Sequence, residues 1–124
     1  LLAWLKQAHI LCAVATSTFT NVAIGYLKNA GVLNCFAAIV GGDQVTKSKP
    51  DPEIFQLAMR ALGKQTPETC VVFEDSRNGL LAGANGGFPV IVVPDLFDPT
   101  LELPGLCYAK CARLDEAIDV IQNS

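Results

Sequence analysis

Two adjacent carboxylates follow an apolar run in the middle of this 124-residue chain: the segment 70–73 (CVVF) leads directly into Glu74 and Asp75. Like charges side by side repel, and neither is stable in an apolar core without a counter-charge. Paired carboxylates of this kind suit Mg²⁺, which proteins usually hold with one or two carboxylates together with waters and phosphate. Taken alone, the pair also fits a solvated turn in which Asp75 or Ser76 caps the next helix.

Three further polar residues follow other apolar runs. Thr16 and Ser17 end the run 10–15 (ILCAVA), and Lys49 comes after the run 36–40 (FAAIV) and a loop. Thr16 offers a hydroxyl donor, and Ser17 offers a backbone N–H near a helix N-terminus, where anions are favoured. Lys49 carries a positive charge on a flexible stem, which suits a phosphate or an acidic nucleophile. With the carboxylates, these groups predict a site that handles phosphate, although none of them is an obvious nucleophile.

The elements that must position these residues follow from the hydrophobic periodicity. Apolar runs predict strands at 10–15, 36–40, 70–73 and 90–93, with a small edge strand at 108–111. Helical spacing predicts helices at 1–8, 19–30, 51–62, 78–85 and 114–121. This alternation predicts an α/β domain whose parallel sheet is covered by helices on both faces. The carboxyl ends of parallel strands share one edge, so the polar residues are expected to converge there.

Composition narrows the class of protein. The length and the 51% hydrophobic content indicate a single globular domain over residues 1–124. A net charge of −3 without a basic cluster argues against a nucleic-acid partner. No apolar run is long enough to span a bilayer, so no membrane partner is expected. Five cysteines, with Cys12 and Cys70 inside apolar runs, predict buried, reduced thiols in a cytoplasmic protein.

The motifs, taken in order, resemble those of a known family. Thr16 and Ser17, then KPDPEIF at 49–55, then VVFEDS at 71–76 with Gly79, resemble the second, third and fourth signature motifs of the haloacid dehalogenase superfamily. The branch that they resemble contains β-phosphoglucomutase and phosphoglycolate phosphatase-like hydrolases, and the resemblance covers about residues 1–94. It implies a Rossmann-like core and a magnesium-dependent phosphohydrolase or phosphomutase. Such an enzyme acts on a small phosphorylated metabolite through an aspartyl-phosphate intermediate.

The resemblance also implies a role for each candidate residue. Thr16 would bind the phosphate through its hydroxyl, helped by the backbone of Ser17. Lys49 would be the catalytic lysine that neutralises the nucleophile and the phosphate. Asp75 would bind Mg²⁺ directly. Glu74 would be a direct ligand, a ligand through water, or an anchor behind the ligands.

One family motif is missing: no Asp-x-Asp follows an apolar strand in this chain. In the family this motif carries the attacking aspartate and precedes a cap domain, so the chain is expected to be a C-terminal fragment without the first strand and cap, inactive alone. The missing strand would lie between the strands at 10–15 and 70–73, which leaves two inner edges unpaired. These edges could pair with each other, recruit a partner chain by self-association, or leave a groove. The alternative reading is a non-catalytic phosphate-binding or interaction protein derived from the same fold.

Overall fold

The computed structural model describes residues 1–94, 98–101, 103 and 105–123, so Asp95 lies outside the described residues. Helices alternate with strands along the chain, as the periodicity predicts. The helices are α1 (Leu2–Gln7), α2 (Thr20–Asn29), α3 (Glu53–Ala61), α4 (Arg77–Asn85) and α5 (Ala117–Gln122). The strands are β1 (Ala13–Ala15), β2 (Ala38–Val40), β3 (Val72–Glu74), β4 (Val90–Val92) and β5 (Ala109–Lys110).

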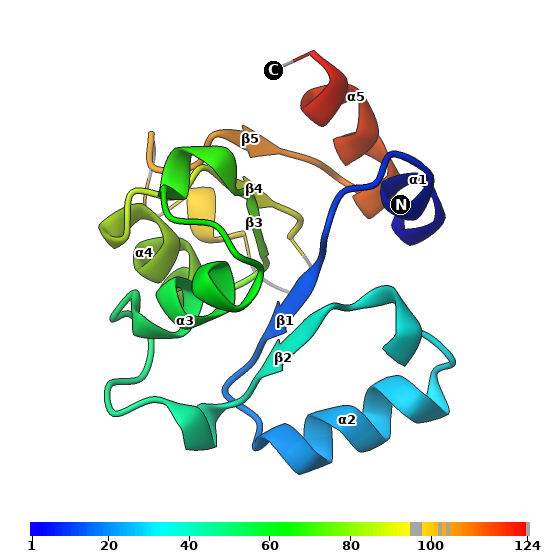
Figure 1. The fold of residues 1–124 in the computed structure, drawn as a ribbon. Coiled ribbons are helices and arrows are strands. Elements are labelled where there is room, and N and C mark those ends of the chain that lie inside the picture. Colours follow the sequence, from blue (N-terminus) through cyan, green and yellow to red (C-terminus); the bar gives the residue numbers. More distant parts are fainter. Residues whose placement is uncertain (95–97, 102, 104, 124) are drawn as a thin grey trace.

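Every strand pairing in the described residues is parallel, but the strands form two sheets. One sheet has the order β1-β2 and the other has the order β3-β4-β5. Helices α3 and α4 cover one face, where α3 packs on β1 and β2 and α4 packs on β3 and β4. Figure 1 shows α2 beside β2 and α5 beside β5, away from α3 and α4. The predicted α/β fold with helices on both faces is therefore confirmed, whereas β1 and β3 do not pair with each other.

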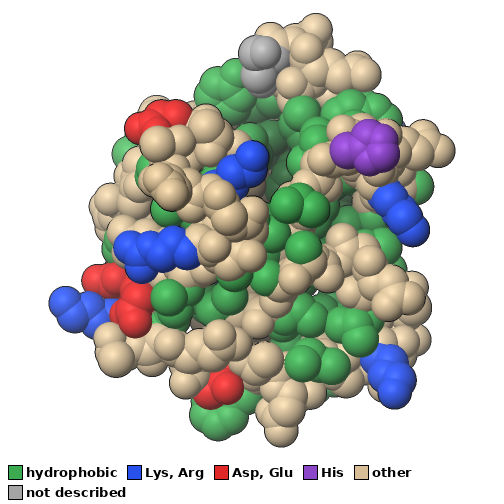
Figure 2. Space-filling view, in the orientation of Figure 1, with side chains coloured by type: hydrophobic (Ala, Val, Ile, Leu, Met, Phe, Trp, Pro, Cys, Tyr) green, Lys and Arg blue, Asp and Glu red, His purple; other side chains and the backbone are tan. Residues whose placement is uncertain are grey.

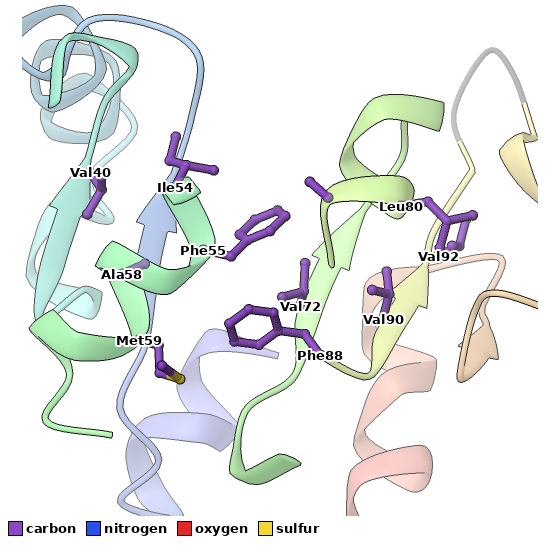
Figure 3. Close-up of a cluster of buried hydrophobic side chains, with 11 residues drawn as sticks. Val40, Ile54, Phe55, Ala58, Met59, Val72, Leu80, Phe88, Val90 and Val92 are labelled. Atoms are coloured by element: carbon purple, nitrogen blue, oxygen red, sulfur yellow. The ribbon is translucent and has the colours of Figure 1, made fainter. Parts of the chain in front are cut away.

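The hydrophobic core continues across the interruption between the two sheets. One cluster of buried side chains includes Val40 of β2, Ile54 and Phe55 of α3, and Val90 of β4. Figure 3 shows Phe55 and Phe88 side by side between the sheets, and their ring centroids lie 6.1 Å apart in an edge-to-face arrangement. Side chains packed around α3 and α4 thus join the two sheets, although no backbone hydrogen bonds pair β1 with β3.

Helix α2 packs less deeply than its sequence predicts. The helix at 19–30 is predicted from the apolar spacing of Phe19, Ala23, Leu27 and Ala30, but among these residues only Ala23 is buried. Phe19 precedes the helix and is 63% exposed, and Tyr26 is 68% exposed. Figure 2 shows hydrophobic side chains at the surface in the lower part of the view, where α2 and the β1–β2 sheet lie in Figure 1. Within the described residues, helix α2 packs mainly on β2 and on the short turns before and after it, so much of its apolar surface is exposed.

Several element boundaries differ from the predictions. Strand β1 begins at Ala13, and the preceding Ile10 and Leu11 are exposed. Helix α3 begins at Glu53 instead of at residue 51, and its N-cap residue is Pro52. Two glycines follow the ends of α2 and α3 and have positive φ, +74° at Gly31 and +77° at Gly63.

The cysteines are less buried than predicted. Cys12 and Cys70 are half-buried, as are Cys35 and Cys107, whereas Cys111 is fully buried. All five thiols are free. Within the described part of the chain, none of the helices has both the length and the apolar character needed to cross a bilayer.

Candidate functional site

The loop before α3 and the end of β3 are joined by an ion pair between Lys49 and Glu74. The Nζ of Lys49 lies 2.8 Å from Oε2 of Glu74, and the two side chains are 13% and 10% exposed. The ammonium group also lies 4.9 Å from the ring centre of Phe55, within the range of a cation–π contact. Lys49 is thus the counter-charge that Glu74 requires, and its position is fixed from two sides.

A tight turn after β3 holds the Glu74 carboxylate from the other side. The hydroxyl of Ser76 donates to Oε1 of Glu74 at 3.1 Å and accepts from the backbone N–H of Gly79 at 3.0 Å. Ser76 is therefore the N-cap of α4, as one sequence interpretation allowed. Gly79 lies so close that a Cβ there would overlap the Glu74 carboxyl group. Both carboxylate oxygens of Glu74 thus have partners within the chain. This favours the interpretation of Glu74 as an anchor over the two interpretations in which it is a metal ligand, direct or through water.

A hollow opens at this edge of the sheets, next to the ion pair. It has a volume of about 540 Å³. Its lining comes from the segment after β1, the loop before α3, and the turn between β3 and α4 with the first residues of α4: Ser17, Ser48, Lys49, Ser76, Arg77 and Asn78. A smaller hollow of about 100 Å³ shares Ser17, Ser48 and Lys49. The structure therefore brings together Ser17, Lys49 and Glu74, as the convergence of parallel strand ends predicts.

The segment after β1 is locked against the segment after β2. The hydroxyl oxygen of Thr16 accepts from the N–H of Thr18 at 3.1 Å, so its side chain shapes the turn that presents Ser17. A Cβ on Gly42 would overlap the carbonyl oxygen of Ser17, so the backbones meet there at a distance that only glycine permits. Thr16 is half-buried and follows β1 directly, but it does not line either hollow.

Asp43 reinforces this contact between the two segments. Its Oδ1 accepts from the backbone N–H of Thr20 at 2.7 Å and from the Thr20 hydroxyl at 2.8 Å. The hydrogen bond from the Thr20 N–H, followed by the one from its hydroxyl, lowers the pKa of Asp43 below its ordinary value. Asp43 thus caps the start of α2 from the short 3₁₀ turn after β2.

Sequence reasoning missed a second carboxylate with a structural task. Glu53, in the first turn of α3, accepts from the N–H groups of Thr46 and Lys47, each at 2.9 Å. These backbone hydrogen bonds lower the pKa of the Glu53 carboxyl. In the sequence analysis Glu53 was only one member of the segment KPDPEIF, in which Lys49 was the candidate residue. The N–H groups of the preceding irregular loop have no strand partners, and this need for acceptors was the signal that could have identified Glu53.

The donors for a divalent cation are incomplete in the described residues. Asp75 is exposed beside the hollow and offers one carboxylate. No group of three or more His, Cys, Asp or Glu side chains is placed to hold a metal within the part of the chain that the structure covers. Mg²⁺ prefers six oxygen ligands, several of which can be waters or phosphate oxygens. At this edge of the sheets, Asp75 is thus the exposed member of the adjacent carboxylate pair.

Comparison with known proteins gives a consistent result. Residues 1–87 match the family model described as haloacid dehalogenase-like hydrolase. Over 86 residues the chain is 41% identical to a phosphorylated carbohydrates phosphatase from Thermotoga maritima, covering 69% of this chain and 39% of that protein. It is also 41% identical over 93 residues to a bifunctional riboflavin kinase/FMN phosphatase from Arabidopsis thaliana, covering 74% of this chain and 24% of that protein.

The fold is shared with a solved relative. The structure of CbbY from Rhodobacter sphaeroides in complex with phosphate superposes with a TM-score of 0.83 and 34% sequence identity. The superposition covers 94% of this chain and 52% of CbbY. The chain thus spans about half the length of this solved relative and less than half the length of the two curated phosphatases.

Proposed function

The chain belongs to the haloacid dehalogenase-like hydrolases, and from that premise we propose that its hollow binds the phosphate group of a small phosphorylated metabolite. The activity served would be that of a magnesium-dependent phosphohydrolase or phosphomutase working through an aspartyl-phosphate intermediate. The attacking aspartate would come from outside the 124 residues, since no Asp-x-Asp follows an apolar strand here. The observation that carries the proposal is the Lys49–Glu74 ion pair beside a hollow lined by hydroxyl groups.

Each residue has a task in this proposal. Lys49 would attract the phosphate and offset the negative charge that gathers on its oxygens during transfer. Ser17 would donate its backbone N–H, and Thr16 would hold the turn and offer its hydroxyl. Glu74 would keep the Lys49 ammonium in place, because their 2.8 Å contact is held further by Ser76.

Asp75 would be a ligand of Mg²⁺, together with protein groups outside this chain, waters and a phosphate oxygen. When bound, the ion would supply positive charge to the phosphoryl oxygens. Of the two adjacent acids after β3, only Asp75 is outside the ion pair with Lys49, so magnesium binding by this chain alone is expected to be weak. The residues at the site fit such an ion only as part of a larger ligand set.

Titration with inorganic phosphate tests the proposal without requiring catalysis. Phosphate added to the ¹⁵N-labelled chain is expected to shift the amide resonances of Ser17, Ser48 and Ser76, and Lys49→Met is expected to abolish these shifts. Lys47→Met is the matched control, because Lys47 is exposed in the same loop and its backbone contact to Glu53 remains. Equal binding by Lys49→Met and Lys47→Met would contradict the assignment.

A further inference from the structure

The loop that carries Lys49 has no regular structure of its own. Residues 45–52 lie between the short turn after β2 and the start of α3, and their backbone is neither strand nor helix. Such a loop has no ladder to satisfy its N–H groups or to fix its path. The position of the Lys49 ammonium therefore depends on the groups that hold this loop.

Glu53 holds the first half of the loop with both of its carboxylate oxygens. Oε1 accepts from the Thr46 N–H at 2.9 Å and from the Thr46 hydroxyl at 3.2 Å. Oε2 accepts from the same hydroxyl at 3.0 Å and from the Lys47 N–H at 2.9 Å. One side chain thus binds three donors on two consecutive loop residues, across the segment that contains Lys49.

Two hydrogen bonds between residues close in sequence hold the second half of the loop. The N–H of Asp51 donates to the carbonyl of Ser48 at 3.0 Å, which forms a turn around Lys49. The N–H of Glu53 donates to Oδ1 of Asp51 at 3.0 Å, which fixes the start of α3. The loop on both sides of Lys49 is therefore held by hydrogen bonds that end on the side chain or the backbone N–H of Glu53.

We propose that Glu53 is a positioning residue that fixes Ser48 and Lys49 for binding an anion in the hollow. This role rests on the phosphate-binding function proposed above. Glu53 does not line either hollow, so it acts through the loop rather than by contact with the anion. Its place in the first turn of α3 suits a negative charge, because the helix dipole is positive at that end.

A glutamine in place of Glu53 gives a sharp comparison. Glutamine has the same shape but one acceptor oxygen, and its NH₂ group would face a loop donor. The loop would lose at least one charge-assisted hydrogen bond and become more mobile. We expect Glu53→Gln to weaken phosphate binding by about five- to tenfold, which is comparable to the net contribution of one ordinary hydrogen bond.

The experiment compares four forms of the 124-residue chain by titration with inorganic phosphate, read from amide resonances. The forms are the natural sequence, Glu53→Gln, Lys49→Met and the control Glu68→Gln. Glu68 is exposed in the 3₁₀ turn before β3, so its substitution makes the same change of charge away from the loop. Expected are weaker binding in Glu53→Gln, no binding in Lys49→Met, and unchanged binding in Glu68→Gln. The amide shifts in the second half of α3, away from the substitution, are expected to stay unchanged in all forms.

The outcomes separate the two proposals. Phosphate affinity of Glu53→Gln equal to that of the natural chain would overturn the positioning role while leaving the hollow as a phosphate site. If phosphate does not bind, or Lys49→Met binds it unchanged, the proposed function fails. The role of Glu53 is then tested by a double-mutant cycle that measures the unfolding free energies of Glu53→Gln, Lys49→Met and the double variant. Non-additive effects of the two substitutions support the positioning role, and additive effects reject it. Should Glu53→Gln not fold, Thr46→Val removes only the hydroxyl donor and must weaken phosphate binding in the same direction.

Discussion

At the scale of single residues, the two adjacent acids after β3 have different environments. Glu74 is nearly buried and shares its oxygens between Lys49 and Ser76, whereas its neighbour Asp75 is exposed. A carboxylate with a basic partner at 2.8 Å needs no metal ion to offset its charge. Asp75 has no such ion pair in the described residues and is the member of the pair that is open to a cation.

Magnesium titration tests this division between the two acids. Weak binding is expected for the 124-residue chain, because a single exposed carboxylate supplies few of the six oxygens that Mg²⁺ prefers. Asp75→Ala is expected to abolish it, as measured by calorimetry or by amide shifts around residue 75. Asp115→Ala removes an exposed acid in the turn before α5 and serves as the control. Binding that survives Asp75→Ala would reject Asp75 as a ligand.

A second residue-scale prediction concerns Gly79. An alanine in a helix is usually more stable than glycine by about 0.5–1 kcal/mol. At Gly79 the added Cβ would overlap the Glu74 carboxyl group, so we expect Gly79→Ala to destabilise the chain by about 1–3 kcal/mol through overpacking. Urea unfolding measures this change. Gly25→Ala in α2 is the control, because no atom lies within 4 Å of its added Cβ; a gain in stability at both positions would contradict the close packing of Gly79 on Glu74.

At the scale of elements, short polar contacts hold the irregular segments between strands and helices. Ser76 caps α4, Asp43 caps α2 from the loop after β2, and Glu53 fixes the loop before α3. These contacts matter because strands β1 to β4 are only three residues long, which leaves long connections without a backbone ladder. The positions of the site residues therefore depend on these contacts, because the site residues lie in the connections that the contacts hold.

Asp98 gives an element-scale prediction near the C-terminus, where it ties the turn at Pro99–Leu101 to β5. Hydrogen bonds from Lys110 and then from the Thr100 hydroxyl lower the pKa of Asp98 from 3.8 to about 2. Because the folded pKa is depressed, the stabilisation is present above pH 3.8 and is lost as the pH falls toward 2. Lys110→Met is expected to raise this pKa, as read from the carboxyl carbon by NMR.

Lys64→Met is the matched control for that titration, since Lys64 is exposed in the turn after α3. It is expected to leave the pKa of Asp98 unchanged. An Asp98 pKa near 3.8 in the natural chain would show that the contact between Lys110 and Asp98 does not persist in solution.

At the scale of the whole molecule, the interruption between β1 and β3 is the dominant feature. The strands lie in separate sheets, although α3 and α4 pack a shared core beneath both. The edge of β1 away from β2 and the edge of β3 away from β4 carry backbone groups without a ladder partner in the described residues. Such edges favour pairing with another strand, whether from the same protein or from a partner.

We therefore expect the 124-residue chain to be marginally stable and to associate through these edges. Buried backbone groups without partners cost about 1–3 kcal/mol each, and a strand from a second copy would satisfy them. Sedimentation or light scattering over a range of concentrations measures this association. Lysine substitution at Val14, in the middle of β1, is expected to reduce it. A monomer that melts cooperatively at all concentrations would contradict this expectation.

Catalysis gives a second prediction for the whole molecule. Positioning groups without a nucleophile lower the barrier to phosphate-ester hydrolysis only slightly, so no turnover of an aryl phosphate with Mg²⁺ is expected from this chain alone. The assay measures release of the phenolate over background, with Lys49→Met as the comparison. Turnover that disappears in Lys49→Met would show that an unrecognised group in these residues attacks phosphorus.

The sequence by itself determined the alternation of strands and helices and the edge at which the polar residues meet. Apolar runs and helical spacing depend on neighbours along the chain, and parallel strands place their carboxyl ends together. The ends of α2 and α3 were also predictable, because Gly31 and Gly63 adopt a backbone conformation that other residues avoid. Ser17, Lys49 and Glu74 could therefore be placed at one site from the sequence.

Only the tertiary structure decided which groups satisfy one another. The Lys49–Glu74 pair joins residues 25 positions apart, and Asp43 reaches Thr20 over 23 positions, distances at which no local pattern operates. The exposure of Phe19 and the separation of β1 from β3 depend on which neighbouring elements are present to cover them. Burial and backbone pairing are properties of the assembled molecule, because each needs a partner that the local sequence does not specify.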